Sequence, residues 1–168
     1  MRRRVIATTV AMLCAAWAAQ AQTGAPTSAA AQNVTVAPID CWWRTTTSAV
    51  RVGELFQVVL TCAVLDTAAT TVVPDQSRLD PTVLQLPPFE VTGGSQGADV
   101  HTPSRRFFQY EYTLRYIGED FGRDIAIPAL TLVYRVQSRV DQNSAAIESR
   151  DRQYNLPPQL MRIESLVP

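Results

Sequence analysis

The sequence predicts an all-β protein: one immunoglobulin-like antiparallel β-sandwich domain that follows a signal peptide. Short runs rich in β-branched and aromatic residues alternate apolar and polar positions, as half-buried strands do. Clusters of Gly, Pro and Asp separate these runs, and no stretch keeps an apolar period of 3.6 residues for three helical turns. Strands at this spacing, with prolines confined to their margins, are typical of a two-layer sandwich.

Five segments carry the strand pattern. The most regular one has an aromatic face, opposite a face on which polar or charged residues occupy every second position. This aromatic face consists of Phe108, Tyr110, Tyr112, Leu114 and Tyr116. The five predicted strands are Cys41–Ser48, Leu55–Leu65, Phe89–Thr92, Arg105–Tyr116 and Ala129–Val136.

Turn signals separate the strands. We expect chain reversals at Val52-Gly53-Glu54, at the glycine run 93–97 and at 118–122, because Gly and Asp favour turn conformations. A further turn is expected at 141–144 and a last strand over Leu160–Ile163. The sandwich domain is therefore predicted over residues 33–140, with 141–168 supplying a last strand and a C-terminal linker.

The N-terminus predicts export. Arg2, Arg3 and Arg4 precede a charge-free apolar run, which ends in Ala19-Gln20-Ala21. This order is typical of a cleaved secretory signal over residues 1–21, and the run is shorter than the roughly 20 residues of a membrane-spanning helix. The small polar residues 22–32 then form a flexible leader. The predicted localisation is the periplasm.

The charge of the predicted mature chain argues against nucleic acid as a partner. Removal of residues 1–21 leaves twelve basic residues against fifteen acidic ones, a net charge of −3. No basic patch remains that would neutralise a phosphate backbone.

Two cysteines remain after the signal, and an even number in an oxidising compartment favours a disulfide. If the chain turns between Arg51 and Val52, residues whose numbers add to 103 face each other, as Cys41 and Cys62 do. Two buried free thiols are the alternative. A redox-active pair is disfavoured because the C-x-x-C spacing is missing.

No motif in the sequence predicts catalysis, a cofactor or a metal site. His101 lies in a polar stretch without a nucleophile or metal-ligand partner, which is typical of a solvated surface histidine. The carboxylates of Glu119, Asp120 and Asp124 do not have the spacing of a calcium loop, and a solvated turn explains them better. We therefore expect a protein that is not an enzyme.

Aromatic residues supply the candidate contacts. The tyrosines of the predicted strand 105–116 are expected in the core, although tyrosines also line carbohydrate and peptide sites. Trp42 and Trp43 are adjacent, so in a strand they face opposite ways and one of them is exposed. Both are candidate contact residues; the alternative is that the exposed one packs on an edge strand of its own domain.

Several of these segments resemble the first periplasmic domain of the BatD, or oxygen-tolerance, family. The similarity runs over residues 50–136 and lies in Val52-Gly53-Glu54-Leu55-Phe56, Leu86-Pro87-Pro88-Phe89-Glu90-Val91, Tyr110-Glu111-Tyr112-Thr113-Leu114 and the run from Gly122 to Leu132. It implies an immunoglobulin-like module of a membrane-anchored protein. Such proteins are encoded in other bacteria beside von Willebrand factor A-type proteins and a MoxR-type ATPase. Members usually continue through further β-domains to a transmembrane helix, so the resemblance implies either a fragment or short gene product, or a soluble relative.

Together these observations predict a non-catalytic periplasmic binding or scaffold module of a membrane-associated envelope complex. The expected partners are envelope proteins, von Willebrand factor A-type proteins among them, and contact with the membrane would come through a partner or through an anchor outside this chain. Two alternatives stay open: a carbohydrate- or peptide-binding domain, and a structural subunit of a surface assembly that accepts a strand from its neighbour.

Overall fold

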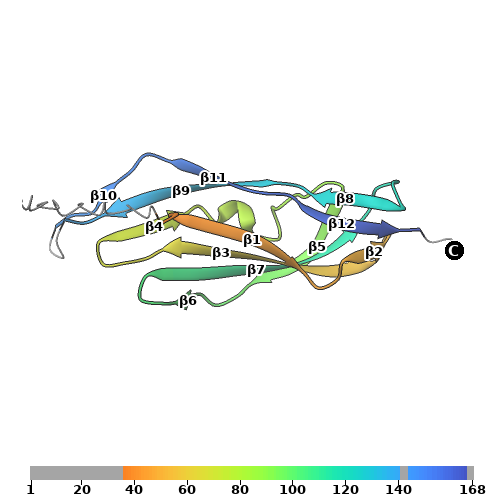
Figure 1. The fold of residues 1–168 in the computed structure, drawn as a ribbon, viewed down its shortest axis with the longest axis horizontal. Helices are drawn as coiled ribbons and strands as arrows, with labels where there is room; N and C mark the ends of the chain where they lie inside the picture. The colour runs from red at the N-terminus through yellow and green to blue at the C-terminus, as the bar shows by residue number, and fades with distance from the viewer. Residues whose placement is uncertain (1–35, 141–143, 166–168) are drawn as a thin grey trace, which may run out of the picture. The chain divides into compact units, whose positions relative to one another are not determined.

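The computed structural model describes residues 36–140 and 144–165, which form β-strands and one 3-10 helix, η1 (Ser77–Leu79). Figure 1 shows the course of the chain. The first sheet has the order β1-β3-β7-β5, with β6 beside β7, and all of its pairs are antiparallel. Its strands are β1 (Ile39–Thr45), β3 (Leu55–Leu65), β5 (Phe89–Gln96), β6 (Val100–His101) and β7 (Arg105–Tyr116).

Two further sheets share one long antiparallel ribbon. In the second sheet β9 lies between β4 on one side and β10 and β11 on the other, and in the third β12 lies between β2 and β8. The pair β2–β12 is parallel. The strands are β4 (Thr70–Pro74), β9 (Leu130–Ser138), β10 (Ile147–Glu148), β11 (Arg152–Leu156), β2 (Ala49–Arg51), β8 (Arg123–Ile127) and β12 (Gln159–Glu164).

Prolines divide this ribbon without changing its register. In the pairs β9–β11 and β8–β12, the numbers of every two residues that face each other add to 286. The same register therefore runs through both pairs, with β8 continuing into β9 and β11 continuing into β12. In that alignment Pro128 faces Pro158, and neither residue has an N–H to donate. The ladder is therefore interrupted where the prolines meet and resumes beyond them (Figure 1).

The core is one hydrophobic cluster with members from all three sheets. The alternation predicted for β3 and β7 is confirmed, because every second residue from Phe56 to Val64 and from Phe108 to Tyr116 is buried. The Tyr112 hydroxyl donates to the backbone carbonyl of Leu79, 2.7 Å away, so this buried polar group has a partner.

The predicted reversal at 93–97 is wrong. After Val91 the register of β5 against β7 shifts by one residue, and the strand then continues to Gln96. The bulge absorbs the glycines that the sequence places there. Gly94 must lack a side chain, since a Cβ would lie 2.3 Å from the backbone oxygen of Glu111 and 2.9 Å from a ring carbon of Pro81.

The chain leaves the first sheet earlier than predicted. The expected strand Cys41–Ser48 ends at Thr45, and the next residues form β2 beside β12. The predicted turn at 52–54 is confirmed, with Gly53 at φ 80° and the Glu54 amide bonded to the Arg51 carbonyl. The predicted strand Leu160–Ile163 lies within β12.

Other predictions concern residues that the structure does not describe. The signal peptide (1–21), the leader (22–32) and three of the four residues of the expected turn at 141–144 fall outside the described residues. Within the described ranges, the strands beyond residue 140 contribute Leu156, Met161 and Ile163 to the core.

Candidate functional site

A disulfide fixes the strand that carries the candidate contact residues. Cys41 of β1 and Cys62 of β3 are bonded, are directly opposite in the ladder, and have Cα atoms 4.1 Å apart. Every pair of β1 with β3 has residue numbers that add to 103, so the predicted register is confirmed. Both cysteines are buried, and the bond therefore ties an edge strand to the interior of the sheet.

A tyrosine from another sheet holds the outer edge of β1. The Tyr154 hydroxyl on β11 accepts from the Cys41 N–H at 3.0 Å and lies 3.1 Å from the Cys41 carbonyl oxygen. Asp40 Oδ1 is 3.3 Å from the same hydroxyl. The single proton of the Tyr154 hydroxyl is therefore shared between the Cys41 carbonyl and the Asp40 carboxylate. The backbone groups of Cys41 that face away from β3 are thus paired. The sequence carried no signal for this contact, since the two residues are 113 positions apart.

The outer face of the first sheet carries an apolar cluster around Trp42. Because Cys41 and Cys62 point into the core, their neighbours Trp42 and Thr61 point outward. Phe107 and Val100 are paired on the same face, opposite Ala63. We call this cluster the Trp42 face; it consists of Trp42, Val59, Thr61, Ala63, Val100 and Phe107.

Exposure is uneven across the Trp42 face. Trp42 is 38% exposed and Val100 60%, whereas Thr61 and Ala63 are 6% and 5% exposed although they lie on the outside of the sheet. Thr61 accepts a hydrogen bond from Gln109 Nε2 at 2.9 Å. Thr61 and Ala63 are therefore covered by their neighbours, while Trp42 and Val100 remain accessible to solvent.

Charged residues surround this apolar centre. Arg44 follows Trp42 on the same face of β1, and Val59 separates it from Glu111 on β7. Asp40 precedes Trp42 on that face and is also exposed. An apolar aromatic centre with a charged rim is the composition of protein-binding surfaces.

The second tryptophan has a different environment. Trp43 is 8% exposed and packs edge-on against Tyr112, with ring centroids 6.3 Å apart. Its Nε1 has no hydrogen-bond partner among the described residues. Of the two candidate contact residues, Trp42 is the one that faces outward.

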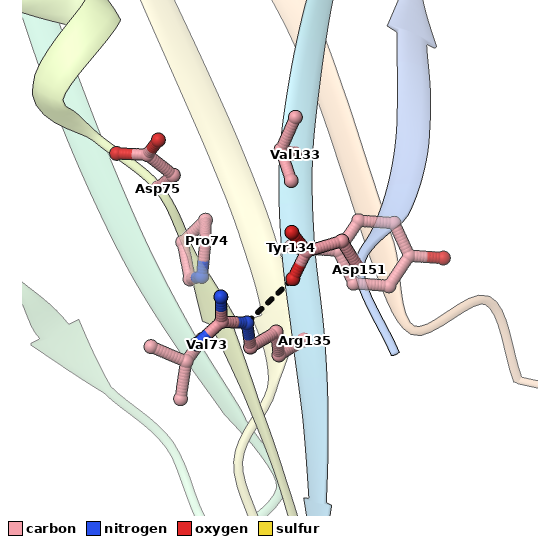
Figure 2. Close-up of a pocket in the computed structure, with 7 residues that line it drawn as sticks. All are labelled: Val73, Pro74, Asp75, Val133, Tyr134, Arg135 and Asp151. Atoms are coloured by element: carbon pink, nitrogen blue, oxygen red, sulfur yellow. Dashed lines mark hydrogen bonds and ion pairs between the residues drawn. The ribbon is translucent and has the colours of Figure 1, made fainter. Parts of the chain in front are cut away.

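A shallow pocket lies on the second sheet, between the end of β4 and β9 (Figure 2). It has a volume of about 240 Å³. Arg135 Nε donates to Asp151 Oδ1 across 2.5 Å, so both charges are paired in the pocket. Ser77 donates to Asp75 and lowers the pKa of that carboxyl. The pocket holds ionised groups that are already satisfied.

Hydrogen bonding and burial shift the pKa values of Asp80, Tyr110 and Tyr112. Thr82 donates to Asp80 and lowers its pKa below the ordinary value, while burial raises the pKa values of Tyr110 and Tyr112 above theirs. All of these shifts lead away from neutral pH. A general acid or base works best with a pKa near the operating pH.

The polar residues singled out in the sequence are dispersed. His101 is exposed, with Nδ1 3.4 Å from Asp66 Oδ2. Asp120 pairs with Arg123, and Asp124 lies 3.5 Å from Arg162. Within the described ranges, no group of three His, Cys, Asp or Glu side chains is placed to hold a metal ion.

Comparison of the chain with protein-family models, curated proteins and solved structures finds no match. The structure also contains, in the part of the chain that it describes, no helix long and apolar enough to span a bilayer.

Proposed function

We propose that the domain is an immunoglobulin-like sandwich. The order β1-β3-β7-β5 corresponds to strands A, B, E and D of such a fold, and β4, β9 and β11 to C, F and G. The parallel pairing of β2 with β12 supports this assignment, because the first strand then passes from one layer to the other. The shared hydrophobic cluster supports two layers packed face to face.

On this fold we propose a non-catalytic binding or scaffold module of the periplasm, acting in a membrane-associated envelope complex. The Trp42 face carries the proposal. The exposed apolar surface of a tryptophan ring is unfavourable in water, and a partner that covers the ring removes this cost. Trp42 lies on a strand that is held by a disulfide and by the hydrogen bonds of Tyr154. A strand that is held in place presents an anchor residue at a smaller ordering cost on binding.

A further observation supports the compartment. A disulfide persists in an oxidising environment such as the periplasm, in agreement with the predicted signal peptide. The similarity to the BatD family favours a von Willebrand factor A-type protein as the partner.

The tyrosines of β7 do not support the alternative of a carbohydrate-binding site. Tyr110, Tyr112 and Tyr116 are each at most 4% exposed, so none of these rings offers a stacking surface to a sugar. The exposed aromatic residue of the first sheet is Trp42, which has the apolar side chains of Val59 and Ala63 beside it and charged residues on either side along β1. This composition favours a protein partner over a polar ligand.

The test is an affinity capture of the tagged mature chain from envelope extracts, compared with Trp42→Ala and Leu160→Ala. Leu160 is the matched control because it is 61% exposed on another sheet. The proposal predicts stoichiometric recovery of a von Willebrand factor A-type protein, loss with Trp42→Ala and retention with Leu160→Ala. Equal recovery with all three chains, or with none, would contradict the proposed surface.

A further inference from the structure

The Trp42 face has a symmetric pattern of residue types along β1. Asp40 and Arg44 lie two positions before and two positions after Trp42, and all three side chains are exposed on the same face of the strand. Neither charged residue has an ion pair within the described residues. β1 therefore carries an acidic and a basic group on the two sides of an aromatic residue, each roughly 7 Å away along the strand.

The adjacent strand β3 repeats this symmetry with apolar residues. Thr61 is the ladder partner of Trp42 and lies between Val59 and Ala63 on the outer face. These two flanking residues are in turn the ladder partners of the two charged residues of β1. Reversing both strands about the row of Trp42 and Thr61 thus brings the acidic position onto the basic one and an apolar residue onto an apolar residue.

A surface with this pattern is complementary to itself. In a dimer with a two-fold axis both copies use the same patch, so every contact between two different residues forms twice. If the axis lies in the interface along the row of Trp42 and Thr61, the outer faces meet with their β1 strands antiparallel. Asp40 of each copy then faces Arg44 of the other, which gives two ion pairs, and the two Trp42 rings meet at the centre.

We propose that the Trp42 face binds a second copy of this chain in this arrangement. The contact removes the exposed ring of Trp42 from water and pairs the charges of Asp40 and Arg44. The inference rests on the proposed function, because it concerns the regulation of the same face. A face that holds a second copy cannot hold an envelope protein, so self-association sets how much of the Trp42 face is free for that partner.

A different two-fold arrangement would use another charge pair. Glu111 of β7 lies in the same row as Arg44, with Val59 between them. An axis along β3 would join Arg44 to Glu111 of the other copy. It would also place Trp42 over Gln109, which belongs to the same row as Trp42. An aromatic pair is stabilised beyond the area that it buries, which favours the axis that brings the two Trp42 rings together.

Sedimentation velocity of the purified mature chain, over about 1–300 μM, measures this self-association. We expect a concentration-dependent dimer of the native chain. Asp40→Arg and Arg44→Asp should each weaken the dimer by about tenfold or more, because either change puts like charges opposite each other twice. An equimolar mixture of the two variants should recover the dimer, since each reversed residue then faces an opposite charge.

The matched control is Arg139→Asp, because Arg139 is an exposed arginine that directly follows β9 in the second sheet. This variant should dimerise as the native chain does. A native chain that stays monomeric over the whole range would overturn the proposal, and so would a mixture that associates no better than its components. Weakening by Glu111→Arg but not by Asp40→Arg would contradict this arrangement and support the other axis. Only the purified chain is present, so failure here leaves the capture of an envelope protein unaffected.

Discussion

Replacing Tyr154 by Phe removes the hydroxyl that joins β11 to β1 and leaves the ring in place. The hydroxyl accepts from the Cys41 N–H at 3.0 Å and donates to oxygens of Cys41 and Asp40 at 3.1 and 3.3 Å. Without it, the outward N–H and C=O of Cys41 lose their partner inside the protein. The change removes both bonds to the Cys41 backbone, together with the contact to Asp40, and keeps the apolar surface of the side chain.

The expected cost follows from these two bonds. A hydrogen bond inside a protein contributes about 0.5–1.5 kcal/mol net, and an unpaired buried group costs about 1–3 kcal/mol. Tyr154 is half-buried, so water replaces part of what is lost. We expect the free energy of unfolding to fall by about 1–2 kcal/mol. With an m-value of about 2 kcal/mol/M, the urea midpoint moves down by about 0.5–1 M.

Urea unfolding followed by tryptophan fluorescence measures this change, with Tyr134→Phe as the matched control. Tyr134 lies on the neighbouring strand β9, and no hydrogen bond of its hydroxyl is present among the described residues. Its replacement should change the free energy of unfolding by less than about 0.5 kcal/mol. Equal stability of Tyr154→Phe and the native chain would refute the role assigned to this hydroxyl.

Three further predictions concern stability. In the double variant Cys41→Ala, Cys62→Ala, the free energy of unfolding measured in urea should fall by about 3 kcal/mol, because the disulfide closes a loop with a separation of 21 residues. A fall of less than about 1 kcal/mol would contradict this prediction. Gly94→Ala should lower the free energy of unfolding, measured by thermal melting, by about 2 kcal/mol or more, because the new Cβ would meet the Glu111 backbone oxygen. An unchanged melting temperature would contradict this and show that β5 shifts to accommodate the methyl group. Burial raises the pKa of Tyr112 above its ordinary value of 10, so its contribution to stability is complete below pH 10 and falls above it, by up to about 1.4 kcal/mol per pH unit. Tyr112→Phe should flatten that fall in unfolding measured between about pH 9 and 11, and an identical slope would contradict the assignment.

Strands whose sequence alternates strictly were predicted to their ends. Both Leu55–Leu65 and Arg105–Tyr116 are β3 and β7 as predicted, because one face of each is apolar at every second position and a shift by one residue would expose it. The same alternation placed Cys62 inward, and the register rule then paired it with Cys41. Local pattern was sufficient for the centre of the first sheet.

Elements that depend on distant contacts were not predictable. The glycine run after Val91 looks like a turn, yet it continues β5 because β7 lies beside it and a bulge absorbs the irregularity. The short strand β2 exists through its pairing with β12, more than a hundred positions away. For the candidate site, alternation predicted that either Trp42 or Trp43 is exposed. The hydrogen bonds of Tyr154 to β1 and the low exposure of Thr61 and Ala63 depend on tertiary packing and were not predicted.

The most direct test of a binding module is a photo-crosslinking amino acid placed at position 42 in the cells that make the protein. We predict that light joins position 42 to one envelope protein, of the von Willebrand factor A type, and that the same amino acid at position 160 gives no such product. Position 160 is the control because Leu160 is 61% exposed on another sheet. No crosslink from position 42, or the same products from both positions, would contradict the proposal that the Trp42 face binds an envelope protein.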